Sequence, residues 1–403
     1  MTKKMTTDFF RFQAQTTPFP YALSISKAKG CYIYDEKKKK YLDLVAGVSA
    51  CSLGHRHPAV VKAIKQQLRK YLHVMVYGEY VQSAPVELCK RLAAVLPDPL
   101  ETTYLTNSGT EAIDGALKLA RRATGRTQIL AMHQAYHGNT YGALSVMGYE
   151  ARKKPFEPLL PEVNFIRFND FDHLSQITTK TAAVIAETIQ GGAGFILPVE
   201  GYLEALRAKC TEVGALLILD EIQPGMGRTG ALFGFEHYNC TPDIVVMGKG
   251  LGGGMPIGAF TASRELMYNL ADNPILGHIT TFGGHPVIAA AALATLKVLT
   301  ESQIMSDVSV KEKTVRQHLK HPLIGEIRGK GLMLAAMLPS DEAVQWVIKD
   351  CLNRGLILFG LLYESKALRI TPPLTISQKQ LRQGCNIILE SLNAYNSRLS
   401  GVN

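Results

Sequence analysis

Lys249 and Asp220 are the residues whose type and surroundings most directly indicate chemistry. Lys249 stands in the glycine-rich segment 248–254 (GKGLGGG), after the apolar run 243–247. A lysine beside glycines has room for a bulky group at its amine. Desolvation there would lower the pKa of the amine and make it a nucleophile toward aldehydes. Asp220 ends the apolar run 215–219, either as a local cap or as a carboxylate at the end of a buried strand, where α/β folds place ligands.

Residues 106–112 (TNSGTEA) could bind a phosphate at a strand-to-helix junction. Ser108 with Glu111 three residues later is the pattern of a capping box, so a purely structural interpretation is available. The same geometry leaves the amides of Gly109 and Thr110 free at a helix N-terminus, where the N–H groups and the helix dipole favour an anion. On these residues alone both interpretations stay open.

Tyr136 stands before His137 and Gly138, in a segment that follows the expected strand 128–132. His133 and His137 are four residues apart, a spacing that could place two metal ligands on one face of a helix. No acid follows in the pattern of zinc proteases, so we predict no metal site and interpret the aromatic residue as a stacking or packing group.

The segment around Lys249 also matches the G-x-G-x-x-G pattern of dinucleotide-binding enzymes. Pro256 follows the glycines 252–254, and such a segment does not readily open the long helix that this fingerprint requires. Gly250 stands where a Walker motif needs Ser or Thr. A phosphate-binding turn, an aromatic residue, a strand-end acid and a glycine-flanked lysine are instead the parts that hold pyridoxal 5′-phosphate, with the lysine in a Schiff base and the acid at the pyridinium nitrogen.

The elements that must position these residues alternate along the chain. Apolar residues spaced three and four apart predict helices, and short apolar runs predict buried strands. The helices are expected over 58–72, 84–96, 110–124 and 201–213, and the strands over 128–132, 163–168, 182–187, 215–220, 243–247 and 258–262. This alternation predicts an α/β domain with a largely parallel sheet covered by helices.

The two chain ends differ from this central part. The first 50 residues have the pattern of strands and an arm, and after Pro286 long helices surround short strand candidates over 325–334, 356–358 and 368–370. We therefore predict an N-terminal arm with part of a smaller α+β domain (1–55), a large domain (56–285), and the C-terminal part of the smaller domain (286–403).

Composition narrows the class of protein. Of 403 residues, 46% are hydrophobic and 19% are charged, as in globular chains. No apolar run approaches the roughly 18–20 residues of a membrane span, and the start predicts no secretory signal, so we expect no membrane partner. Seven dispersed cysteines favour reduced thiols in the cytoplasm. The net charge of +10 favours anionic small molecules; the lysines 37–40 read as a hairpin tip, and no nucleic-acid motif is present.

Together these segments resemble class III (ω-amino-acid type) aminotransferases, which are fold-type I pyridoxal-phosphate enzymes, and among them the acetylornithine/ornithine aminotransferases. The resemblance runs from about residue 30 to residue 373. Its motifs are GHRHP (54–58), SGTEA (108–112), YHG (136–138), DEIQ (220–223), GMGRTG (225–230), GKG (248–250), TFGG (281–284) and RITPP (369–373). It implies a large domain with a mainly parallel seven-stranded sheet and a smaller α+β domain built from both chain ends.

The resemblance also implies a role for each matching residue. Lys249 would carry the cofactor in a Schiff base and move a proton on the substrate, while Asp220 would keep the ring nitrogen protonated. Arg369 would clamp a substrate carboxylate. Thr281 would reach the phosphate of the neighbouring subunit, so a homodimer with shared active sites is implied. The other cofactor contacts would be Gly109 and Thr110 at the phosphate with Ser108 beside them, Tyr136 and His137 at the ring, and Gln223 near the ring hydroxyl with Glu187 close by.

Two positions depart from the pattern of ornithine-, acetylornithine- and aminobutyrate-type members. These usually carry Arg after the aromatic-His-Gly triplet, where it grasps a second carboxylate, and this chain has Asn139 there. They also carry Glu two residues after the Gln of the E-x-x-Q-G segment, where it pairs with the carboxylate-binding arginine. This chain has Gly192 at that place, so we expect Arg369 to stay available.

We therefore expect a cytoplasmic, homodimeric transaminase that moves a primary amino group from an amino acid or ω-amine donor to a 2-oxo acid by a ping-pong mechanism. A diaminopelargonate-type or other amine-using transaminase is an alternative, as is an aminomutase, racemase or decarboxylase on the same scaffold. Rivals from other classes are a nicotinamide oxidoreductase and a non-catalytic polyanion-binding protein.

Overall fold

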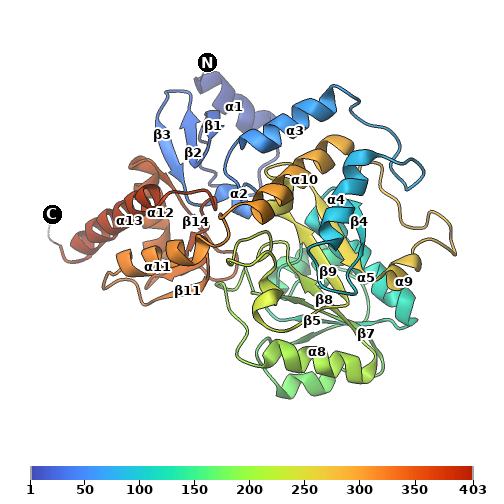
Figure 1. Ribbon diagram of the computed structural model, residues 1–403. Coiled ribbons are helices and arrows are strands. Elements are labelled where there is room, and N and C mark those ends of the chain that lie inside the picture. Colours follow the sequence, from blue (N-terminus) through green and yellow to red (C-terminus); the bar gives the residue numbers. More distant parts are fainter. Residues whose placement is uncertain (1, 402–403) are drawn as a thin grey trace.

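The centre of the molecule is a seven-stranded sheet, which the computed structural model shows together with the rest of residues 2–401 (Figure 1). Its strands, in order across the sheet, are β4 (Thr102–Thr106), β10 (Gly258–Ala262), β9 (Ile244–Gly248), β8 (Leu216–Asp220), β7 (Thr181–Glu187), β5 (Gln128–Met132) and β6 (Val163–Ile166). Of these, β10 runs antiparallel to both its neighbours, and the other pairs are parallel. The predicted mainly parallel sheet is confirmed.

Helices cover both faces of this sheet, because its strands carry apolar residues on both sides. The helices around it are α3 (Pro58–Leu68), α4 (Ser83–Ala93), α5 (Gly109–Thr124), α8 (Tyr202–Val213), α9 (Arg264–Tyr268) and α10 (Pro286–Glu301). In β8, Leu217 and Leu219 belong to the buried cluster shared with α4, α8 and α10. Ile218 belongs to the opposite cluster, with α5. Figure 1 shows α3, α4 and α10 together on one side and α8 at the lower edge.

Two four-stranded sheets accompany the central one. One has the order β1 (Ile25–Lys29), β2 (Tyr32–Asp35), β3 (Lys40–Asp43) and β13 (Leu356–Ile357), and the other β11 (Glu326–Lys330), β12 (Met333–Met337), β15 (Ala367–Ile370) and β14 (Phe359–Gly360). Since β13 pairs in parallel with β3, the two chain ends share one sheet. The helices α11 (Val308–His318), α12 (Asp341–Asn353) and α13 (Gln378–Leu399) complete this part. The α+β unit from both chain ends is therefore present, and the domain boundaries after residues 55 and 285 stay predictions.

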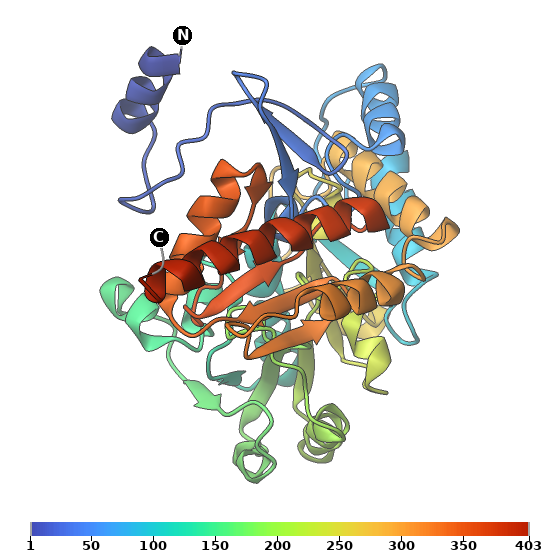
Figure 2. The same ribbon diagram turned by 90° about the vertical axis from the view of Figure 1, so that its left-hand side faces the viewer.

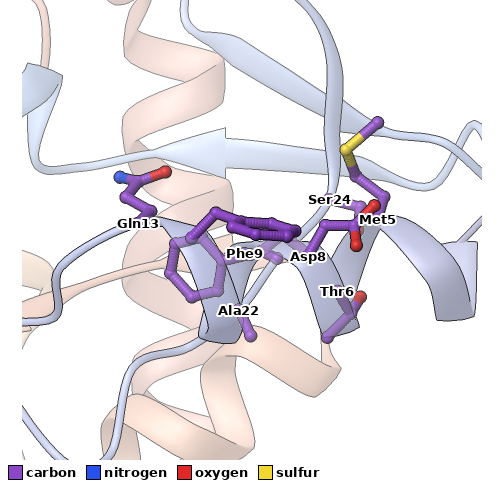
Figure 3. Close-up of a pocket in the computed structure, with 9 residues that line it drawn as sticks. Met5, Thr6, Asp8, Phe9, Gln13, Ala22 and Ser24 are labelled. Atoms are coloured by element: carbon purple, nitrogen blue, oxygen red, sulfur yellow. The ribbon is translucent and has the colours of Figure 1, made fainter.

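The remaining helices are short, apart from the first. They are α1 (Thr2–Phe12), α2 (Ala46–Ser49), α6 (Tyr141–Ser145) and α7 (Glu150–Lys153), with 3₁₀ turns η1 (Lys154–Phe156), η2 (Asp172–Gln176), η3 (Gly234–His237) and η4 (Lys249–Gly252). The sequence pattern did not predict α1, which stands apart from the body in Figure 2. Figure 3 shows a pocket beside it, which Met5, Phe9 and Ala22 line.

Two further expectations are refined. The single strand expected over 325–334 is a hairpin, because Gly331, with a φ of 63°, forms the turn between β11 and β12. Residues 37–39 lie at the exposed connection between β2 and β3, as predicted, and Lys40 begins β3. In the part of the chain that the structure describes, no helix is long and apolar enough to cross a membrane.

Candidate active site

A cavity of about 430 Å³ lies at the carboxyl ends of the central strands. The carboxyl ends of parallel strands meet at one edge of a sheet, so residues that follow different strands converge there. The predicted residues that line the cavity are Gly109, Thr110, Tyr136, His137, Asn139, Glu187, Asp220, Gln223, Lys249 and Arg369. Ser108 and Thr281 are not among the lining residues.

Asp220 is held in place by two contacts at the end of β8. Its Oδ2 lies 2.8 Å from Nδ1 of His137, and both side chains are buried. Its Oδ1 accepts a hydrogen bond from the amide of Ile222 at 2.9 Å. Asp220 is thus both a local turn cap and a carboxylate in the cavity wall, so the two interpretations of the sequence do not exclude each other.

Lys249 follows β9 and begins the turn η4 with a φ of 39°. Desolvation is the main cause that lowers the pKa of its amine; Arg369 adds to this effect, while Asp220 and Glu187 oppose it. A lowered pKa leaves more of the amine neutral and nucleophilic. The neighbouring Gly250 leaves room for the side chain of Ser52, because a Cβ at Gly250 would lie 2.6 Å from Oγ of Ser52.

The phosphate-binding turn is formed where α5 begins. Ser108 is the N-cap, and its Oγ accepts the amide of Glu111 at 3.4 Å. The expected reciprocal bond is displaced by one residue, because Oε2 of Glu111 accepts from the amide of Asn107 at 2.7 Å. The hydroxyl of Ser108 therefore caps the helix, whereas Gly109 and Thr110 face the cavity. Amides in the first turn of a helix have no intrahelical partner and favour an anion.

Glu187 and Gln223 form a polar wall. The oxygens of Glu187 accept the amides of Tyr136 and Gly191, each at 2.9 Å. Burial is the main cause that raises the pKa of Glu187 to about 7; Asp220 raises it further and His137 lowers it. Nε2 of Gln223 is buried and has no hydrogen-bond partner among the described residues. A buried donor without a partner marks a place for a ligand oxygen.

Arg369, on β15, supplies a buried positive charge. Its exposed fraction is 4%, and its Nε and Nη1 have no hydrogen-bond partner among the described residues. Burial lowers the pKa of its guanidinium to about 10, so the group stays charged at neutral pH. Its guanidinium carbon lies 5.9 Å from the ring centre of Phe195. A buried cation without a partner calls for an anion, and the planar guanidinium suits a carboxylate.

Three lining residues were not found from the sequence: Val48, Phe359 and Leu362. Val48 belongs to a left-handed turn in which Ala46, Gly47, Val48 and Ser49 have φ values of 52°, 59°, 57° and 68°. Only Gly47 could have signalled this conformation, since other residues avoid it. Phe359 and Leu362 lie on or next to the short strand β14, which has no strong pattern of its own.

The structure does not bring the other candidates into the cavity. Thr281 is exposed in the segment between α9 and α10, so its expected contact with a neighbouring subunit stays a prediction. His133 lies beside the ring of Phe165, whereas His137 binds Asp220. Among the described residues, no group of three or more His, Cys, Asp or Glu side chains could hold a metal ion.

These features fit pyridoxal phosphate. A helix N-terminus suits its phosphate, the unpartnered Gln223 amide suits a ring oxygen, Asp220 suits the ring nitrogen, and Lys249 suits the aldehyde. A large, mainly parallel α/β sheet with this site at its carboxyl edge defines a pyridoxal-phosphate-dependent transferase of fold type I.

Within that class, the chain belongs to the class-III aminotransferases, which match residues 12–392. It is 37% identical to the acetylornithine aminotransferase of Methanopyrus kandleri over 93% of this chain and 95% of that one. It is 40% identical to the putrescine aminotransferase of Pectobacterium atrosepticum, over 92% and 81%. The crystal structure of the ornithine aminotransferase of Toxoplasma gondii matches with a TM-score of 0.92 and 28% identity, over 99% and 96% of the two chains. The protein is thus a pyridoxal-phosphate-dependent transaminase.

Proposed function

We propose that this transaminase takes the amino group of a primary amine that carries no carboxylate at the end away from the reacting amino group. It gives this amino group to a 2-oxo acid held by Arg369. The observation that carries the proposal is the buried guanidinium of Arg369, which lacks a hydrogen-bond partner at Nε and Nη1 and lines the same cavity as Lys249. Among the described residues that line the cavity, these two are the only Lys or Arg side chains. Since Lys249 serves the cofactor, one cation remains for one carboxylate.

We assign the following roles to the residues of the cavity. Bound pyridoxal phosphate supplies an aldehyde that accepts the amino group and a ring that withdraws electrons. Gly109 and Thr110 hold its phosphate, and Asp220 holds a negative charge at the ring nitrogen. Nζ of Lys249 takes and returns the proton of the substrate carbon, because desolvation keeps its pKa low. Arg369 orients the oxo acid by its carboxylate.

Asn139 supports an amine donor without a carboxylate at its far end. Its side chain is neutral, and its Nδ2 donates to the hydroxyl of Tyr136 at 3.2 Å. A diamine such as putrescine carries no carboxylate and needs no cation at position 139, whereas acetylornithine reacts at its far amine and places its carboxylate away from the reacting end, where Asn139 offers no charge. The relative named for putrescine agrees with this choice, whereas the relatives named for acetylornithine favour acetylornithine as an alternative donor.

A donor panel tests the proposal. Putrescine, acetylornithine and ornithine are each paired with pyruvate and with 2-oxoglutarate, alanine is paired with 2-oxoglutarate, and the amino acid formed is measured. We expect putrescine to exceed acetylornithine, and pyruvate to exceed 2-oxoglutarate, whose second carboxylate has no partner. Lys249→Met should abolish transfer, while Lys65→Met on α3 should not. Efficient use of acetylornithine by the wild type would contradict the donor assignment, and no net transfer to any oxo acid would favour a mutase, racemase or decarboxylase.

We also propose a homodimer that works in the cytoplasm. Thr281 lies outside the cavity of its own chain on an exposed segment, which supports a contact with a second subunit. Large apolar side chains at Phe19 and Val81 are 85% and 95% exposed, as residues of an interface are in a single chain. All seven cysteines are free, which suits a reducing compartment. Light scattering gives the mass of the assembly, which should be that of a dimer. Thr281→Val should weaken cofactor retention without changing this mass.

A further inference from the structure

Gly192 and Tyr363 interlock at one wall of the cavity. Gly192 lines the cavity at the loop that follows β7, and Tyr363 follows β14 in the C-terminal part. The amide of Tyr363 donates to the carbonyl oxygen of Gly192 at 3.0 Å. A Cβ built on Gly192 would lie 2.9 Å from both Cδ2 and Cε2 of the Tyr363 ring. The ring therefore fills the space into which any side chain at position 192 would project.

The ring of Tyr363 also joins two further loops of the cavity wall. Its hydroxyl donates to the carbonyl oxygen of Ala135 at 3.4 Å, directly before Tyr136. Its face stacks on Tyr149, with ring centres 4.5 Å apart and planes within 5°. The Tyr136 ring lies 6.5 Å away at a tilt of 58°. One side chain thus connects the loops after β5, before α7 and after β7.

The position of Tyr363 has a consequence for the shape of the cavity. Gly192 lines the cavity and Tyr363 does not, so the ring stands directly behind the glycine. Removing the ring would leave a space that continues from the cavity past Gly192. The same removal would free the backbone before Tyr136, which also lines the cavity.

We propose that Tyr363 is a specificity-determining residue of the donor side. It limits the size of the amine that reacts by filling the space behind Gly192, and it positions the loop that carries Tyr136. This inference rests on the proposed function, since it names what restricts the amine donor of the same site.

The experiment compares two donors, putrescine and the bulkier benzylamine, with pyruvate as acceptor. We expect Tyr363→Ala to raise the ratio of kcat/KM for benzylamine over putrescine by about tenfold or more, because one enlarged pocket changes discrimination by that order. Tyr363→Phe keeps the ring and should leave the ratio near that of the wild type. Tyr268→Ala, an exposed tyrosine on α9, is the matched control and should change nothing. An unchanged ratio in Tyr363→Ala overturns the proposal; if that variant does not fold, Tyr363→Val tests the same direction.

A double-mutant cycle tests the interlock separately. Gly192→Ala alone should lower kcat/KM for both amines and the unfolding temperature, because the methyl group meets the ring. In the Tyr363→Ala background the same change should have little effect on either quantity. Equal effects of Gly192→Ala in both backgrounds would overturn the inference. If the wild type transfers no amino group from any amine, the proposed function fails, and the coupling of the two changes in unfolding temperature still decides whether the pair interlocks.

Discussion

Nε2 of His55 lies 2.8 Å from Oδ2 of Asp43, and Oδ1 of Asp43 accepts the amides of Val45 and Ala46 at 2.8 and 2.9 Å. These amides precede and begin the left-handed turn that places Val48 in the cavity wall. Left-handed conformations cost non-glycine residues about 1–2 kcal/mol each. The pair of Asp43 and His55 therefore supports a strained turn next to the active site.

We expect His55→Gln to destabilise the protein in a pH-dependent way. The hydrogen bond to Asp43 is the main cause that raises the pKa of His55 to about 9 from the ordinary value of 6.5. A raised histidine pKa stabilises the folded state fully below about pH 6.5, and this stabilisation is lost as the pH rises through about 9. Because water screens the partly exposed ring, we expect the free energy of unfolding of His55→Gln to be lower than that of the wild type by about 1 kcal/mol at low pH.

Urea unfolding of wild type and His55→Gln at about pH 6 and about pH 9.5 measures this difference. The two proteins should differ at the lower pH and converge at the higher one. His321→Gln, at a half-buried histidine far from Asp43 in the sequence, is the control. A gap between wild type and His55→Gln that is constant with pH would show that the ion pair is not its cause.

Glu187→Gln should flatten the pH dependence of stability in the acidic range. Burial raises the pKa of Glu187 to about 7 from 4.5. The folded state then holds a proton that the unfolded state has lost, so stability falls as the pH rises from about 4.5 through about 7. Over this pH interval the free energy of unfolding of the wild type should fall by about 2–3 kcal/mol more than that of the variant. The free energy of unfolding at several pH values checks this, and parallel curves would refute it.

Asp220→Asn should lower kcat by about a hundredfold to ten-thousandfold. The amide keeps the shape of the side chain, but it cannot offer a negative charge to the ring nitrogen of the bound cofactor. Asp307→Asn, at an exposed position before α11, is the matched control. The measurement is kcat with cofactor content determined by absorbance. Nearly wild-type kcat at full cofactor occupancy would remove Asp220 from the catalytic residues.

Arg369→Met should raise KM for the 2-oxo acid by about thirtyfold or more, since losing one partner of a buried charge pair costs at least about 2 kcal/mol. The rate of the single-turnover reaction with an amine that has no carboxylate should change much less, because Arg369 has no group to bind on such a substrate. Arg382→Met, on the exposed side of α13, is the control. Equal losses with both substrates would indicate that Arg369 acts through the fold rather than through the carboxylate.

Much of the site was determined by the sequence alone. Asp220 and Lys249 each follow a buried apolar run, and Gly109 begins a helix directly after a strand. Such local patterns predict where strands end, and the parallel sheet gathers strand ends at one edge. Arg369 was assigned from its motif, and the structure adds that its buried Nε and Nη1 have no hydrogen-bond partner among the described residues.

Other features were decided only by tertiary structure. Val48 enters the cavity through a left-handed turn held by Asp43 and His55. Tyr363 meets Gly192 from a distant part of the chain, so neither residue signals the other locally. Contacts of this kind depend on how three separate sheets pack together, and hydrophobic periodicity reports only which face of an element is buried, not what lies against it.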